Sequence, residues 1–144
     1  MRVGDFEVEI PIPAKEKASS PIQTTDWELV QKAWWDGVIA MVNNKEKSPV
    51  RIALEMRITG DSDVTMAPQR GNKHGTASIE VVTSMPAVEN KKGIWKDFKQ
   101  TLANVWLSYT DPDGNHLAVR PHWAKEWYVL NVNRLDLKNF IQKQ

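Results

Sequence analysis

The segment at residues 50–59 (VRIALEMRIT) constrains the fold of this chain most, because its apolar and polar side chains alternate strictly. A period of two places successive side chains on opposite faces of a β-strand. The alternation separates an aliphatic set from a more polar set: Ile52, Leu54, Met56 and Ile58 against Arg51, Ala53, Glu55 and Arg57. We expect the aliphatic face to pack on helices, whereas the polar face meets water, another domain or a ligand.

Two more segments have the character of strands. Residues 5–13 (DFEVEIPIP) alternate between apolar side chains and the carboxylates Glu7 and Glu9. Pro11 and Pro13 in this segment favour an edge position or the end of strand pairing. Residues 76–84 (TASIEVVTS) are rich in β-branched residues and form the third predicted strand.

A helix is predicted between the first two strands. Thr25 is the expected N-cap, and Glu28, three residues later, completes a capping box. Apolar residues then recur at intervals of three and four, and Asn43 and Asn44 are expected to end the helix. The expected core-facing stripe consists of Trp27, Val30, Trp34, Val38 and Met41.

A second helix is predicted over residues 92–109, with a continuous apolar face, and a last helix over residues 135–144. The order is therefore strand, helix, strand, strand, helix and then an irregular C-terminal tail. This order is typical of the β-α-β-β-α opening of a ferredoxin-like fold. We expect one α+β domain over residues 1–144, in which helices cover one face of an antiparallel sheet.

Composition excludes several classes of protein. The net charge of +1 gives no electrostatic basis for nucleic-acid binding. The absence of cysteine excludes disulfides, thiolate nucleophiles and zinc–cysteine sites. The chain begins without an apolar signal segment and has no apolar run of the roughly 20 residues that cross a bilayer, so we expect a soluble protein with no membrane association indicated.

Tryptophan is unusually frequent, with seven residues. A large aromatic side chain at helical spacing is most often part of a core. The sequence therefore predicts core positions for five of them: Trp27, Trp34, Trp35, Trp95 and Trp106.

Two groups of residues are candidates for chemistry. Glu55 and Arg57 lie two positions apart on the predicted strand, so their side chains share one face at a separation of roughly 7 Å. The run RPHWAK at residues 120–125 brings two cations, an imidazole and an indole into six residues. Such a cluster can hold an anion or polarise a carbonyl or alkoxide oxygen. An ordinary solvated strand face and a surface turn remain open as structural alternatives.

Other motifs are weaker. Asp61 and Asp63 could bind a cation, but they lie in a predicted turn that explains them fully. The three histidines are far apart and lack metal-binding spacing, so no metal site is predicted. Glycine-rich phosphate loops and the GxSxG nucleophile elbow are absent.

The two candidate groups together resemble a known family. RPHWAK at residues 120–125 resembles the RPHW(G/A)K motif of the vanillyl-alcohol-oxidase superfamily of FAD-linked oxidases. The resemblance is greatest to sugar-lactone oxidases of the D-arabinono-1,4-lactone oxidase type, alditol oxidases and flavin-linked sterol oxidases. LEMR at residues 54–57, followed by residues 61–68, is similar to the E-x-R, D-D and S-P stretch of that family, although Ala67 stands where serine is usual. The similarity covers about residues 5–130.

The resemblance implies that the chain is the substrate-binding (cap) part of a larger flavoprotein. FAD would be held mainly by a separate FAD-binding domain, which would be the partner of this chain. In such enzymes a hydride passes from an alcohol or sugar-type substrate to flavin N5, and oxygen or another acceptor reoxidises the flavin.

The same resemblance implies roles for individual residues. Glu55, Arg57 and Lys125 would be catalytic, with the two cations stabilising negative charge on the substrate oxygen or the reduced flavin. Substrate or flavin would also be contacted by His122, Trp123, Arg120, Ser78 and Glu80. We expect Glu55, Arg57 and Lys125 to converge on one face of the sheet.

Two other functional classes remain open. The chain could be a non-enzymatic α+β binding domain that uses Arg57, Arg120 and Lys125 as a cationic surface patch. It could also be an independent small enzyme, although the sequence contains no nucleophile or metal cluster that would support this.

Overall fold

The computed structural model describes residues 2–44, 49–89 and 93–127. Within these ranges the chain forms β1 (Val3–Pro11), α1 (Trp27–Asn43), β2 (Ala53–Thr59), β3 (Thr76–Ser84), α2 (Met85–Val88), α3 (Ile94–Trp106) and β4 (Arg120–Pro121). The third predicted strand has the bounds of β3, and the other predicted elements differ from the observed ones by a few residues at their ends. The sequence analysis missed α2, and the helix predicted at residues 135–144 lies outside the described residues.

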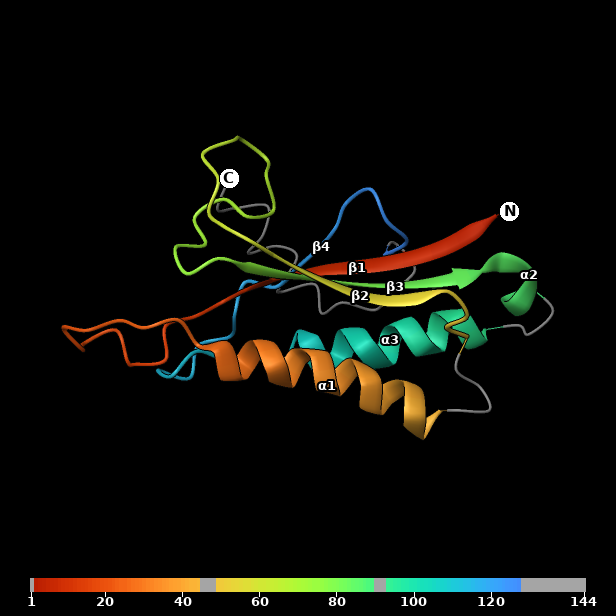
Figure 1. The fold of residues 1–144 in the computed structure, drawn as a ribbon, viewed down its shortest axis with the longest axis horizontal. Helices are drawn as coiled ribbons and strands as arrows, with labels where there is room; N and C mark the ends of the chain where they lie inside the picture. Colours follow the sequence, from red (N-terminus) through yellow and green to blue (C-terminus); the bar gives the residue numbers. More distant parts are fainter. Residues whose placement is uncertain (1, 45–48, 90–92, 128–144) are drawn as a thin grey trace.

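The described strands form one antiparallel four-stranded sheet in the order β2-β3-β1-β4. Figure 1 shows α1 and α3 on the same side of this sheet. The predicted α+β architecture, an antiparallel sheet with helices on one face, is therefore confirmed.

The core lies between the sheet and the two longer helices. Phe6 of β1 stacks on Trp106 of α3, with ring centroids 6.2 Å apart, and both side chains are fully buried. The Trp106 indole N–H donates a hydrogen bond to the Ala33 carbonyl oxygen at 3.0 Å, which joins α3 to α1. Of the predicted core tryptophans, Trp95 and Trp106 are buried and Trp34 is half-buried.

The predicted packing face of α1 was partly wrong. The buried residues of α1 are Val30, Ala33, Gly37 and Ala40, whereas Trp27 and Trp35 are 53% and 58% exposed. The physical reason is close packing: a Cβ atom at Gly37 would lie 3.2 Å from the Trp106 ring, so the helix approaches the core too closely at this point for a large side chain.

The N-terminus of α1 also differs from the prediction. Asp26, not Thr25, is the N-cap, and its carboxylate accepts a hydrogen bond from the Leu29 backbone N–H at 3.0 Å. Glu28 forms an ion pair with Lys15 at 2.6 Å instead of completing a capping box. The predicted end of the helix at Asn43 and Asn44 is confirmed.

The aliphatic face of β2 is less buried than expected. Leu54 packs against the core, but Met56 and Ile58 are 36% and 45% exposed. They oppose Ile79 and Ala77 of β3 on the helix side of the sheet, so the alternation was read correctly. Because β2 is an edge strand, the helices cover these side chains only in part. Within the described ranges, the structure contains no helix with the length and hydropathy that a bilayer crossing requires.

Candidate functional site

The face of the sheet opposite the helices carries two rows of polar side chains. In the first row Glu55 of β2 pairs with Glu80 of β3, which pairs with Glu7 of β1. The backbone N–H of His122, directly after β4, donates to the Glu7 carbonyl oxygen at 2.9 Å and extends this row. The second row runs through Arg57, Ser78, Glu9 and Arg120. Strand pairing thus places seven of the eight predicted site residues in these rows or beside them. The seven are Glu55, Arg57, Ser78, Glu80, Arg120, His122 and Lys125. Trp123 is the exception.

Glu80 joins the two candidate motifs. Its Oε2 accepts a hydrogen bond from the Arg57 guanidinium at 3.2 Å, and its Oε1 accepts one from the Lys125 ammonium at 2.8 Å. Glu55 lies on the same face, opposite Glu80 in the ladder, and is exposed. The expected convergence of Glu55, Arg57 and Lys125 on one face is therefore confirmed as geometry, and their chemical roles remain a prediction.

Glu126 fixes the position of Lys125. The Glu126 carboxylate accepts hydrogen bonds from the Trp95 indole N–H at 2.7 Å and from the Lys99 ammonium at 3.1 Å, both on α3. The Glu126 backbone N–H donates to the Asp5 carbonyl oxygen at 3.1 Å. The neighbouring side chain of Lys125 is directed to the Asp5 carboxylate, at 3.0 Å, and to Glu80. Sequence reasoning missed Glu126 and Lys99, since nothing in their spacing shows that they meet.

The network consists of carboxylates paired with cations, so Arg57 and Lys125 are not the open cations that a cationic surface patch would require. Arg57 binds the Glu7 carboxylate at 2.6 Å as well as Glu80, and Lys125 binds Asp5 as well as Glu80. These contacts raise the pKa of Arg57, mainly through the hydrogen bond to Glu7, and the pKa of Lys125, mainly through the hydrogen bond to Glu80. This pairing arises because β1 contributes the acidic side chains of Asp5 and Glu7 to the same face.

Glu7 and Glu9 are the functional candidates that the sequence analysis did not single out. They are only 3% and 2% exposed, although both were correctly placed on the polar face of the first strand. Burial raises the pKa of Glu9 and the nearby charge of Glu7 adds to this effect, whereas the hydrogen bond from the Ser78 hydroxyl opposes it. Strand alternation alone places these carboxylates on the polar face, and the pairing of β1 and β2 with β3 then brings Glu7 to Arg57.

The other motif residues lie around this network. Arg120 is half-buried, and its guanidinium donates to the Pro68 carbonyl oxygen at 3.1 Å. Trp123 is 65% exposed, so the structure does not bring it into the charge network. The weaker candidate Asp61 accepts hydrogen bonds from the backbone N–H groups of Ser62 and Gly71, as expected for a turn residue.

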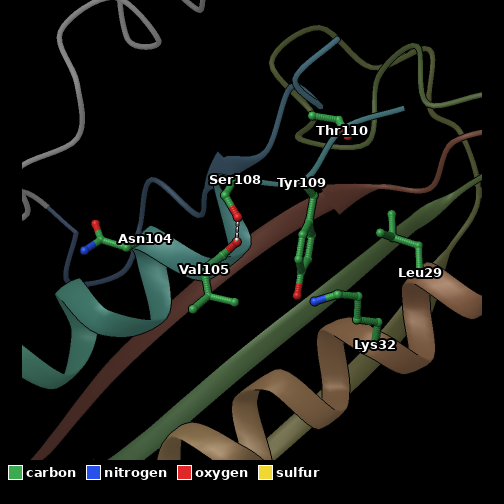
Figure 2. A pocket seen from close by; sticks show the side chains of 7 residues that line it. All are labelled: Leu29, Lys32, Asn104, Val105, Ser108, Tyr109 and Thr110. Carbon is green, nitrogen blue, oxygen red and sulfur yellow. Dashed lines mark hydrogen bonds between the residues drawn. The ribbon is translucent and has the colours of Figure 1, made fainter. Parts of the chain in front are cut away.

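A cleft lies on the other side of the molecule, between α1 and the C-terminal end of α3 (Figure 2). Its lining includes Lys32 and Tyr109, with the Lys32 ammonium 4.9 Å from the centre of the Tyr109 ring. The Tyr109 hydroxyl donates a hydrogen bond to Asp36 at 2.6 Å, and Lys32 pairs with the same carboxylate. These contacts join α1 to the chain after α3, and none of the predicted site residues lines the cleft.

Comparison with known proteins finds no matching family, no matching curated protein and no matching solved structure. The functional interpretation therefore depends on the motifs and on the geometry of the polar face.

Proposed function

We propose that this chain is the substrate-side (cap) domain of an FAD-dependent oxidase that acts on an alcohol or sugar-type substrate. One observation carries the proposal: the Glu80 carboxylate lies between Arg57 and Lys125, so the LEMR and RPHWAK motifs meet on one sheet face.

The geometry fits the part of the site that faces substrate and the flavin ring. Arg57 and Glu55 are on a strand, which holds their side chains in a fixed relation, and Lys125 is held by its two carboxylate partners. Bound FAD would accept the hydride that leaves the substrate carbon, while the hydroxyl proton passes to a base and the substrate becomes a carbonyl compound.

The residues of this chain would supply positioning and charge. Arg57 and Lys125 would stabilise negative charge on the substrate oxygen, because a preorganised cation in a site that excludes water has a strong effect. Glu80 would hold both cations at a fixed separation. Ser78, His122, Trp123 and Arg120 would shape the surroundings of the substrate.

The experiment uses the complete natural protein that carries this sequence, together with any subunit that copurifies with it. We expect it to contain flavin, detected by its visible absorption, and to be reduced anaerobically by a member of a panel of sugar lactones, alditols and sterols. Arg57→Ala should lower the rate of flavin reduction by roughly 100-fold or more, since a preorganised charge partner is lost.

Arg70→Ala is the matched control, because Arg70 is an exposed arginine in the loop between β2 and β3. It should leave the rate of flavin reduction unchanged. A complete protein without flavin, or equal rates for Arg57→Ala and the wild type, would contradict the proposal. The first of these results would favour a non-enzymatic binding domain instead.

A further inference from the structure

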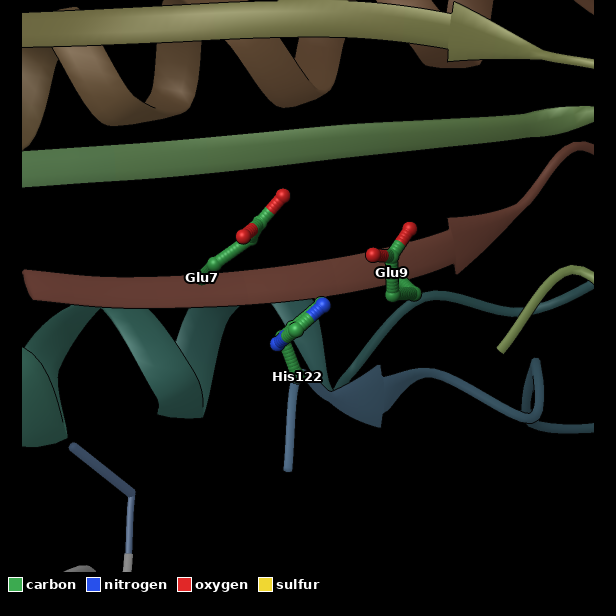
Figure 3. A group of neighbouring side chains, drawn as sticks. All are labelled: Glu7, Glu9 and His122. Atoms are coloured by element: carbon green, nitrogen blue, oxygen red, sulfur yellow. The ribbon is translucent and has the colours of Figure 1, made fainter. Parts of the chain in front are cut away.

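Two buried carboxylates and an imidazole meet on the polar face of the sheet. Glu7 and Glu9 are almost completely buried. His122 is half-buried, so an ion can reach the cluster from solvent at the His122 side. Each residue offers one ligand atom, a carboxylate oxygen or a ring nitrogen, and these atoms all lie within 4.8 Å of one another. Figure 3 shows the two carboxylates projecting from β1 with the His122 ring beside them.

The backbone dictates this arrangement. Glu7 and Glu9 are two residues apart on β1, so their side chains share a face. The pairing of β4 with β1, followed by the hydrogen bond from the His122 backbone N–H to the Glu7 carbonyl oxygen, places the imidazole next to them. Ligands on paired strands are preorganised, which reduces the entropy lost when an ion binds.

The charges of the cluster are only partly balanced. A buried carboxylate is costly unless a cation or several hydrogen bonds compensate for it. Arg57 compensates for Glu7, which retains a second oxygen for another ligand. Glu9 accepts a hydrogen bond from the Ser78 hydroxyl, while the ion pairs of Arg57, Lys99 and Lys125 are with other carboxylates.

We propose that Glu7, Glu9 and His122 hold a divalent transition-metal ion. Two carboxylate oxygens and one imidazole nitrogen form a mixed ligand set that suits Zn²⁺ and its neighbours better than Mg²⁺ or Ca²⁺, which prefer oxygen alone. Three protein ligands leave a coordination position open for water or a substrate oxygen. This proposal does not depend on the oxidase function, because the ion would neutralise Glu9 in either case.

The test is a calorimetric titration of the chelator-treated chain with Zn²⁺ alone. We expect stoichiometric binding that weakens at least about tenfold in Glu9→Gln and in His122→Ala, since even residues that only orient ligands change metal affinity by this much. Glu9→Gln keeps the shape of the side chain and an oxygen acceptor for Ser78. His116→Ala is the matched control, because His116 is exposed and lies outside the cluster. It should bind Zn²⁺ like the wild type.

Far-ultraviolet circular dichroism shows whether each variant is folded. Should a variant not fold, nuclear magnetic resonance of the wild-type chain with Co²⁺ provides a second test. The paramagnetic ion should shift the His122 imidazole resonances and leave those of His74 and His116 near their original positions. Absence of Zn²⁺ binding by the folded wild type, unchanged affinity in folded Glu9→Gln, or Co²⁺ shifts at another histidine would each overturn the proposal.

Discussion

At the scale of single residues, the carboxylate of Glu80 is the shared partner of Arg57 and Lys125. Its two oxygens bind the cations of two segments that are far apart in the chain, and its side chain is 10% exposed. A shared buried acceptor of this kind makes the positions of Arg57 and Lys125 interdependent. Changes at Glu80 should therefore affect both cations together.

Glu80→Gln should destabilise the fold by about 1–3 kcal/mol. The neutral amide would weaken two charge-assisted hydrogen bonds, and the partial exposure of Arg57 to solvent keeps the loss below that for a fully buried pair. Urea unfolding of both proteins measures the difference. Glu55→Gln, the exposed neighbour of Glu80 in the ladder, is the control and should change stability by no more than about 0.5 kcal/mol.

Tryptophan provides a second prediction at this scale. Trp106→Ala should cost roughly 3–5 kcal/mol, because a fully buried indole and its hydrogen bond to Ala33 are removed and a cavity is left. Trp35→Ala, at a position that is 58% exposed, should cost far less. Denaturant titration of the two variants makes the comparison. A loss below about 1 kcal/mol for Trp106→Ala would show that this residue is not in the core.

At the scale of elements, the contact between α1 and the rest of the core depends on small side chains. Gly37→Leu should destabilise the fold by about 1–3 kcal/mol, since even a Cβ atom there would lie 3.2 Å from Trp106 and 3.6 Å from Leu54. Gln31→Leu, at an exposed position of the same helix, should have little effect. Thermal unfolding of both variants tests this; equal melting temperatures would mean that α1 packs through another face.

The contact between α1 and the chain after α3 should depend on pH. Burial, followed by the hydrogen bond to Asp36, raises the pKa of Tyr109 well above its usual value of 10.0. The folded state therefore favours the protonated phenol. The contribution of Tyr109 to the free energy of unfolding is complete below about pH 10 and declines as the pH rises above it. Stability should fall between about pH 9 and 11 by more in the wild type than in Tyr109→Phe. Identical pH dependence of urea unfolding in the two proteins would contradict this assignment.

The sequence predicted strands better than helix faces, for a physical reason. Strict alternation fixes which side chains share a face, so β3 and the polar sets of β1 and β2 were predicted correctly. On α1 the large apolar residues suggested the core side, but packing density selected Ala33 and Gly37 instead. The cluster of Glu7, Glu9 and His122 could not be found from spacing, because strand pairing assembles it from distant segments.

At the scale of the whole molecule, the polar face of the sheet is occupied by its own side chains. Asp5, Glu7, Glu80, Arg57 and Lys125 bind one another there. FAD carries a pyrophosphate that is usually held by backbone N–H groups of a glycine-rich loop at a helix N-terminus, and the sequence contains no such loop. Acidic side chains near the cations would also repel a phosphate.

The chain studied alone should therefore not retain FAD. After incubation with excess FAD and dialysis, we expect a colourless sample, because the chain would supply only the substrate side of a flavin site and the phosphate groups would stay in water. Visible absorption of the dialysed protein measures retained flavin, and a parallel sample of FAD without the chain shows whether dialysis removes free flavin completely. Stoichiometric flavin in the dialysed sample would mean that this chain holds the whole cofactor. The proposal that a separate domain binds most of the FAD would then be wrong, even if Arg57 and Lys125 proved to be essential for oxidation.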